Sequence, residues 1–145
     1  MTRTALDTSV LIASLDTGHL HFGLAATYFD DAKAGSRTLL VAAHALAETF
    51  ATLTAMPVSP RVGPAKALRL IDESVLSVAE VVALDGDDYR AVLGRIADLG
   101  LASGAVYDAL HVRAAEKAHA DELVTFNGRD FRRMPPADPC RLVVL

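Results

Sequence analysis

The sequence contains no tryptophan and one cysteine, Cys140, among its 145 residues. A lone cysteine cannot close an internal disulfide or build a thiolate zinc site, so disulfide-stabilised and zinc-ribbon folds are excluded. Long uncharged apolar runs are also missing, because Asp7, Asp16 and Glu48 interrupt the best candidates before they reach the ~18 residues that a membrane span needs. Asp7 also lies inside the run that a signal peptide would require, and we therefore expect a cytoplasmic protein without membrane association.

An excess of positive charge is absent as well. The chain has 14 Lys and Arg against 18 Asp and Glu, which gives a net charge of −4 and a pI near 5.6. This balance argues against a protein that coats nucleic acid through bulk positive charge, but it is compatible with a nuclease whose acidic site holds cations. With 52% hydrophobic residues, the chain is suited to one domain, residues 1–145, with a substantial core.

Hydrophobic periodicity and turn residues predict strands and helices that alternate along the chain. Strands are expected at the N-terminus up to residue 6, within 75–84, and over 38–42, 122–126 and 141–145. Helices are expected over 10–15, 20–34, 44–55, 65–72, 87–99 and 105–120. Such alternation is typical of an α/β fold in three layers, a central parallel sheet flanked by helices.

An acid stands where the first strand ends. Residues 5–12 read Ala-Leu-Asp-Thr-Ser-Val-Leu-Ile, so that Asp7 and two hydroxyl residues separate two apolar runs. Thr8 or Ser9 is predicted to cap the following helix by accepting a hydrogen bond from a free backbone amide. Asp7 then either shares this capping or lies at the carboxyl edge of the sheet, where open α/β folds bind ligands.

Glu48 lies in the helix predicted over 44–55. The apolar residues Leu46, Phe50 and Leu53 of this helix recur at i, i+4 and i+7 and predict its buried face. Glu48 falls on the opposite side, where its neighbours are mainly small. The carboxylate is therefore either simply solvated or accessible to a cleft.

Asp108 lies on an unusual face of the helix predicted over 105–120. Its helical neighbours are mostly apolar, namely Ala105, His111, Val112 and Ala115. Burying an ionised carboxylate without a partner costs several kcal/mol, so something should compensate the charge. Two alternatives are an ion pair with a protonated His111 and a cation shared with Asp7.

A third polar segment follows the strand predicted over 122–126. It contains Thr125, Asn127 and the acid Asp130, although Asn127-Gly128 is also an ordinary turn signal. A site made of carboxylates, without cysteine and with histidine outside it, favours Mg²⁺ or Mn²⁺ over zinc. A hard cation that keeps bound water is suited to hydrolysing phosphodiesters. The residues by themselves thus indicate metal-dependent phosphoryl chemistry at the edge of an α/β sheet.

Four segments resemble the PIN domain and, within it, the ribonuclease toxins of VapBC-type toxin–antitoxin pairs. They are Leu6-Asp7-Thr8-Ser9-Val10-Leu11, Ala47-Glu48, Tyr107-Asp108-Ala109-Leu110-His111, and Leu123-Val124-Thr125-Phe126-Asn127 with Asp130-Phe131. The resemblance implies a Rossmann-like fold and Mg²⁺-dependent endoribonuclease activity on single-stranded RNA. Mn²⁺ is the alternative to Mg²⁺ that the carboxylate ligands allow. It also implies a small VapB-like antitoxin as partner and a homodimer.

The resemblance also implies roles for particular residues. Asp7, Glu48 and Asp108 match the metal-binding and catalytic acids of the family, and Ser9 and Thr125 match positions that support the site. Asn127 stands where many members have Asp. Asp130 is then the nearest carboxylate that can complete the metal ligands, with a weaker second metal or a single metal completed by water as alternatives.

Asn127 keeps a different class of function open. A PIN-like binding module with weak or lost nuclease activity would act through its partner complex.

Other enzyme classes are disfavoured by missing motifs. Ser9 stands where phosphatases of the haloacid dehalogenase type need a second Asp, and the chain has no G-x-S-x-G, P-loop or G-x-G-x-x-G.

Overall fold

All 145 residues are described by a computed structural model. Five parallel strands form one sheet in the order β3-β2-β1-β4-β5. The strands are β1 (Thr2–Leu6), β2 (Arg37–Ala42), β3 (Ala79–Val82), β4 (Glu122–Thr125) and β5 (Arg141–Val144). The helices are α1 (Thr8–Leu15), α2 (Phe22–Lys33), α3 (Ala43–Ala55), α4 (Pro64–Leu70) with its π-helical continuation η1 (Ile71–Leu76), α5 (Gly86–Asp98), α6 (Ala105–Lys117) and α7 (Gly128–Phe131). None of these helices has the length and apolar character needed to cross a membrane.

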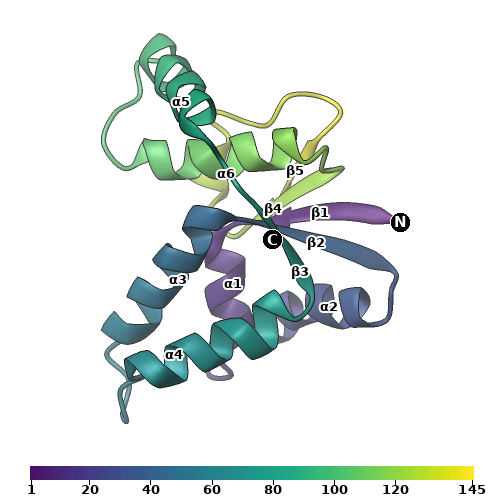
Figure 1. The fold of residues 1–145 in the computed structure, drawn as a ribbon, viewed down its shortest axis with the longest axis vertical. Coiled ribbons are helices and arrows are strands. Elements are labelled where there is room, and N and C mark those ends of the chain that lie inside the picture. The colour runs from purple at the N-terminus through teal and green to yellow at the C-terminus, as the bar shows by residue number, and fades with distance from the viewer.

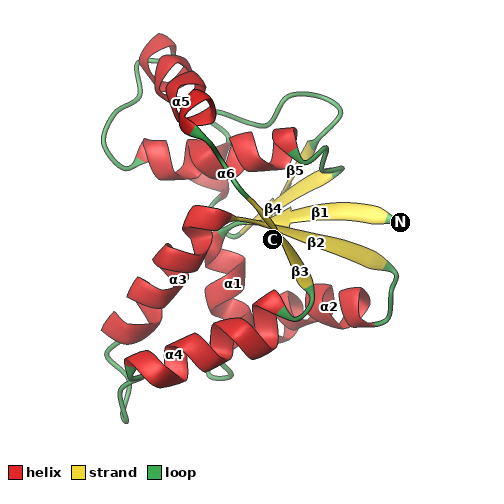
Figure 2. Ribbon diagram, viewed as in Figure 1, coloured by secondary structure: helices red, strands yellow, loops and turns green.

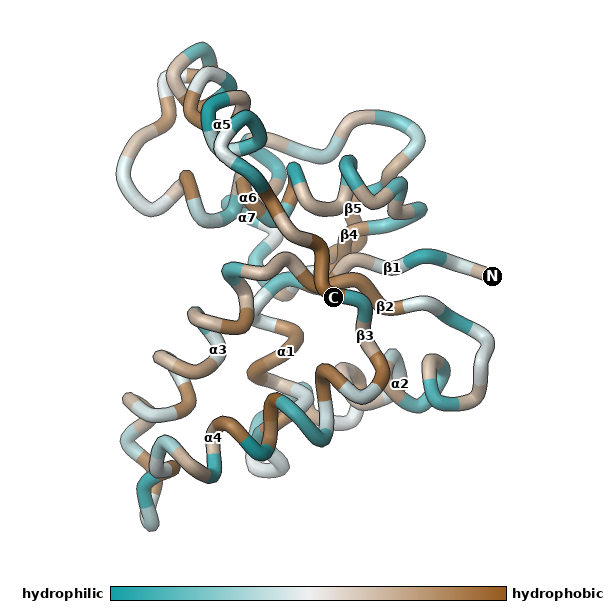
Figure 3. Tube along the Cα trace, in the orientation of Figure 1, coloured by the Kyte–Doolittle hydropathy of each residue, from teal (hydrophilic) through white to brown (hydrophobic).

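Helices cover both faces of the sheet. Helices α1 to α4 lie on one face, and α5 and α6 lie on the other (Figure 1, Figure 2). Apolar residues gather along the strands, whereas α4 alternates between apolar and polar residues (Figure 3). Successive side chains of a strand point to opposite faces of the sheet. Leu6, Val41 and Val124 therefore pack with α1, α2 and α3. Their neighbours Ala5, Leu40 and Leu123 pack with α6 on the other face. The predicted three-layer α/β fold with a parallel central sheet is confirmed.

The strand register brings the carboxyl ends of the central strands to one level. Leu6 of β1 pairs with Val41 of β2 on one side and Val124 of β4 on the other. The residue that follows β1, Asp7, donates its backbone N–H to the Val124 carbonyl over 3.2 Å. Helices α1 and α3 begin at this edge, and α6 runs back towards the amino edge (Figure 1). This edge is where open parallel sheets bind ligands.

The buried face of α3 differs from the predicted one. Ala45, Thr49 and Leu53 are buried, whereas Phe50 is exposed and Leu46 is only partly buried. Small side chains on the buried face let α3 pack close to the main core cluster, to which Ala45 belongs. The prediction for Phe50 is therefore wrong, because a helical stripe of large residues does not reveal where the helix can approach its neighbours most closely.

Two other segments continue further than expected. The helix predicted over 65–72 extends as η1 to Leu76, since Ile71 and Val75 continue its buried face. Asn127-Gly128, predicted as a turn, leads into the short helix α7. Phe131 of this helix is fully buried and anchors it against the core cluster beneath α6.

Candidate active site at the carboxyl edge

Asp7 is almost fully buried between β1 and α1, and both of its carboxylate oxygens are held. Oδ1 accepts hydrogen bonds from Ser9 Oγ over 2.6 Å and from the Val10 backbone N–H over 3.3 Å. Oδ2 accepts one from Thr125 Oγ1 over 2.8 Å. Asp7 is thus the cap of α1. The prediction that Thr8 or Ser9 would cap it is wrong, because the helix begins at Thr8, two residues before its predicted start, and includes both hydroxyl residues.

Glu48 lies on α3, where one carboxylate oxygen gathers three partners. Its Oε1 is 2.9 Å from His44 Nε2 and 3.2 Å from His111 Nε2, and it accepts a hydrogen bond from Thr8 Oγ1 over 3.1 Å. Burial acts to raise the pKa of Glu48, but the bonds to His111 and His44 outweigh it and hold the pKa well below its usual range. Glu48 is therefore ionised and fixed in orientation.

Asp108 is the acid whose charge is least compensated. Burial on α6 raises its pKa to about 6. The charge of His111 lowers this pKa, while those of three neighbouring acids, Asp130, Asp7 and Glu48, raise it further. His111 is not the ion-pair partner of Asp108, because its Nε2 is directed at Glu48. Three acids from other parts of the chain thus interact electrostatically with Asp108.

Asp130 of α7 is better compensated. Its Oδ2 accepts a hydrogen bond from Asn127 Nδ2 over 2.8 Å, and its Oδ1 accepts one from the Arg133 guanidinium over 3.1 Å. The backbone N–H of Asn127 donates to Thr125 Oγ1, which in turn donates to Asp7. Asn127 therefore connects the carboxylates of Asp130 and Asp7 through its own side chain and backbone.

These carboxylates fit a hard divalent cation. They supply only oxygen atoms as ligands, which Mg²⁺ and Mn²⁺ prefer. Asp108 lacks a partner for its negative charge, and a bound cation would neutralise that charge. A second group of potential ligands adjoins them: one ligand atom each of His44, Glu48 and His111 lies within 4.8 Å of the other two. Two imidazoles and a carboxylate are typical ligands of zinc and other transition metals.

The expectation that histidine lies outside the site is therefore wrong. His111 is buried, and His44 is held between Glu48 and the Tyr107 carbonyl, 3.1 Å away. The sequence contained one signal for His44, since it precedes Glu48 by four residues and thus shares its helix face. Thr8 was also missed as a partner of Glu48, and nothing local in the sequence points to that contact.

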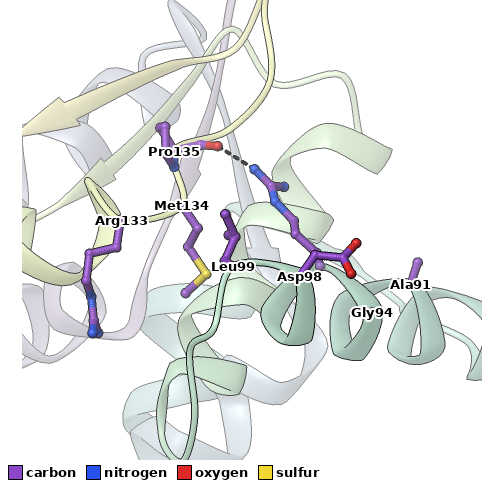
Figure 4. A pocket seen from close by; sticks show the side chains of 8 residues that line it. Ala91, Gly94, Asp98, Leu99, Arg133, Met134 and Pro135 are labelled. Atoms are coloured by element: carbon purple, nitrogen blue, oxygen red, sulfur yellow. Dashed lines mark hydrogen bonds between the residues drawn. The ribbon is translucent and has the colours of Figure 1, made fainter.

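A wide pocket lies elsewhere, between α5 and the segment that follows α7. It has a volume of about 540 Å³ and is lined by Ala91, Gly94, Arg95, Asp98, Leu99, Arg133, Met134 and Pro135. Arg95 donates a hydrogen bond over 2.7 Å to the carbonyl of Pro135, which lies at this pocket beside Met134 (Figure 4). None of the predicted site acids lines this pocket, so chemistry rather than cavity size identifies the candidate active site.

Known proteins share this arrangement of elements. The family model for the PIN domain matches residues 4–135. Ribonuclease VapC40 of Mycobacterium tuberculosis is 31% identical over 140 residues, which cover 97% of this chain and 96% of the relative. Ribonuclease VapC27 of the same organism is 33% identical over 125 residues, covering 86% and 85% of the two chains.

A solved structure has the same fold at lower sequence identity. The structure of VapBC2 from Rickettsia felis, bound to a DNA fragment from the promoter, superimposes with a TM-score of 0.70 and 19% identity. The superposition covers 99% of both chains. The likeness therefore includes all five strands and the carboxyl edge at which the acids lie.

Proposed function

Since this chain belongs to the PIN-domain family, and within it to the VapC-like proteins, we propose that it is a metal-dependent endoribonuclease, the toxin of a toxin–antitoxin pair. Both Mycobacterium tuberculosis relatives are named ribonucleases, which supports the activity. The observation that carries the proposal is the half-buried Asp108. Its pKa is raised to about 6 by burial among further acids, as expected of a carboxylate that a cation completes.

The proposed ligands of Mg²⁺ or Mn²⁺ are Asp7, Asp108 and Glu48, with Asp130 as a further carboxylate. A cation held by these carboxylates would supply the Lewis acidity that activates water, orients the phosphate and offsets the charge on the leaving oxygen. Asp7 contributes a carboxylate held at both oxygens, so that its ligand geometry is set before the substrate arrives. Ser9, Thr125 and Asn127 support this geometry.

Glu48 orients the attacking water in this proposal. Its Oε1 is committed to His44, His111 and Thr8, which leaves Oε2 to accept a hydrogen bond from water. Because its pKa lies well below the usual range, Glu48 is a weak base, and we assign it the positioning of water rather than storage of the proton. The water attacks phosphorus in line, without a covalent enzyme intermediate, and the products carry 5′-phosphate and 3′-hydroxyl ends.

The proposed partners follow from the relatives. VapBC-5 of Mycobacterium tuberculosis, a structural neighbour, is described as a member of the VapBC family of toxin–antitoxin systems, which supports a small antitoxin as partner of the present chain. We further propose that the protein acts on RNA in the cytoplasm as a homodimer and that the antitoxin blocks the acidic site. The alternative, a PIN-like binding module with weak or lost nuclease activity that acts through its partner complex, has only the amide of Asn127 in its favour.

RNA cleavage by the purified protein tests the proposal. We expect cleavage of single-stranded RNA with Mg²⁺ or Mn²⁺, loss of cleavage with EDTA, and loss in Asp7→Asn and Asp108→Asn although both variants remain folded by circular dichroism. Asp98→Asn on α5, outside the site, is the matched control and should cleave as the wild type does. Full activity of either site variant would refute the assignment, and an inactive but RNA- or antitoxin-binding wild type would favour the binding module.

A further inference from the structure

Three aromatic rings gather where β4 ends. Phe126 directly follows β4, and His19 and His21 come from the loop between α1 and α2. The His21 and Phe126 rings are stacked, with centroids 4.7 Å apart and planes inclined by 18°. His19 lies at the side of both, with ring centroids 5.8 Å from His21 and 6.4 Å from Phe126.

This cluster is connected to Asp7 of the candidate active site. The Phe126 backbone N–H donates to Ser9 Oγ over 3.1 Å, and Ser9 Oγ donates to Asp7 Oδ1 over 2.6 Å. Thr125, the residue before Phe126, donates to the other oxygen of Asp7. Two consecutive hydrogen bonds thus hold the Phe126 backbone at a set position relative to Asp7, and both histidine rings contact the Phe126 ring.

The outer surface of the cluster is open to solvent. Phe126 is half-buried and packs against the main core cluster, which gives the stack a rigid base. His21 is exposed although one face of its ring covers Phe126, so its opposite face is the one that meets solvent. The backbone N–H of His21 donates to His19 Nδ1 over 3.0 Å, which restrains the loop. Little ordering would therefore be needed for a planar ligand to extend the stack.

We propose that His19, His21 and Phe126 form a stacking platform that receives an unpaired nucleobase of single-stranded RNA beside the phosphate to be cleaved. This inference rests on the proposed function and adds a substrate subsite to it. Aromatic side chains bind unpaired bases through their π-faces, and this contact tolerates different bases. Such a platform is useful next to acids, because it contributes affinity that does not depend on phosphate charge.

The test uses single-stranded RNA that carries the fluorescent base 2-aminopurine at one position at a time. The full-length protein is titrated in Ca²⁺ in place of Mg²⁺, and gels confirm that the strand stays intact. We expect quenching at one position in the strand with the wild type, and a loss of this quenching together with about 5- to 30-fold weaker binding in His21→Ala. His21→Phe should restore both, since it keeps the ring and removes the ring nitrogens.

His119→Asn is the matched control. His119 precedes β4 at the opposite edge of the sheet and has a positive φ of 52°, which Asn tolerates. This variant should bind RNA as the wild type does. Phe126→Leu, which keeps apolar volume but loses the ring, should weaken the quenching without unfolding the protein.

The outcomes separate the platform from the proposed function. A wild type that cleaves RNA with Mg²⁺ while His21→Ala binds and quenches equally well would overturn the platform and leave the nuclease intact. A wild type that neither binds nor cleaves RNA would overturn both. Unchanged RNA affinity in His21→Ala, together with a weakened antitoxin complex, would assign the rings to a protein partner instead.

Discussion

At the scale of single residues, the acids of the site differ in how their charges are balanced. Asp7 and Asp130 accept hydrogen bonds at both oxygens, and Glu48 is paired with imidazoles. Asp108 has no such partner. Its pKa is raised from the usual 3.8 to about 6, which means that ionisation of its carboxyl group destabilises the folded state. This destabilisation is absent well below pH 4 and fully present above about pH 6. Active sites commonly contain destabilised charges of this kind, which a bound ligand compensates.

Asp108→Asn should therefore stabilise the metal-free protein at pH 8. A pKa difference of this size corresponds to about 3 kcal/mol, which we reduce to about 1–2 kcal/mol because the side chain is only half-buried. The gain should nearly vanish at about pH 3, below the ordinary pKa of 3.8, where the wild-type carboxylate is mostly protonated in the unfolded and folded states alike. Urea unfolding in EDTA at both pH values measures it, and Asp98→Asn should change little. An equal gain at both pH values would contradict the charge argument.

Thr125 is one of two supporting residues, with Ser9, whose side chain donates a hydrogen bond to Asp7. It is fully buried, donates to Asp7 and accepts from the Asn127 backbone. We expect Thr125→Val, which keeps the shape, to cost about 1–2 kcal/mol in unfolding free energy and about 10- to 100-fold in cleavage rate. Thr125→Ser should recover most of the rate, because it restores the hydroxyl. Wild-type kinetics in the Val variant would mean that Asp7 is held without this bond.

At the scale of elements, α5 and α6 are tied together beside the site. Asp85 and Asp88 cap α5 reciprocally through their side chains and backbones. Asp88 also pairs with Lys117 and Arg113 of α6, and the hydrogen bond from Lys117 is the main reason that its pKa lies well below the usual range. The acids at the start of α5 thus also fix α5 against α6, the helix that carries Asp108.

The start of α7 requires glycine at position 128. A Cβ at Gly128 would lie 2.7 and 2.9 Å from the methyl groups of Val144 on β5. Gly128→Ala should therefore destabilise the fold by about 1–3 kcal/mol and displace Asn127 and Asp130. Gly94→Ala in α5, where a Cβ meets nothing within 4 Å, should instead stabilise by about 0.5–1 kcal/mol.

Thermal unfolding of both variants measures these differences. Adding Val144→Ala to Gly128→Ala should recover most of the lost stability, because it removes the methyl groups that obstruct the new Cβ. A Gly128→Ala variant as stable as the wild type would show that β5 can move away at no cost.

At the scale of the whole molecule, the site and the core are separate. The four hydrophobic clusters consist of apolar residues, two of them between the sheet and the helices and two among the helices and the segments beside them, while the acids lie at the carboxyl edge. Folding should therefore not require the cation. Removal of metal should abolish cleavage and leave the fold.

Circular dichroism and calorimetry can check this separation. The EDTA-treated wild type should keep its secondary structure and a cooperative transition, and a Mg²⁺ concentration 100 times the dissociation constant should add about 2.7 kcal/mol. Asp108→Asn should lose most of this gain. Unfolding by EDTA would mean that the cation is structural instead.

The sequence by itself determined the alternation of strands and helices, the parallel three-layer fold and the positions of Asp7 and Asp108 in their elements. Local periodicity contains this information, because it reflects which side of an element meets the core. Only the tertiary structure decided that Thr8 meets Glu48 and His111, 40 and 103 residues away, and that Asp130 is paired while Asp108 is not. The way in which α3 and α6 are rotated against the sheet sets these contacts, and that rotation depends on packing between elements, which no local pattern encodes.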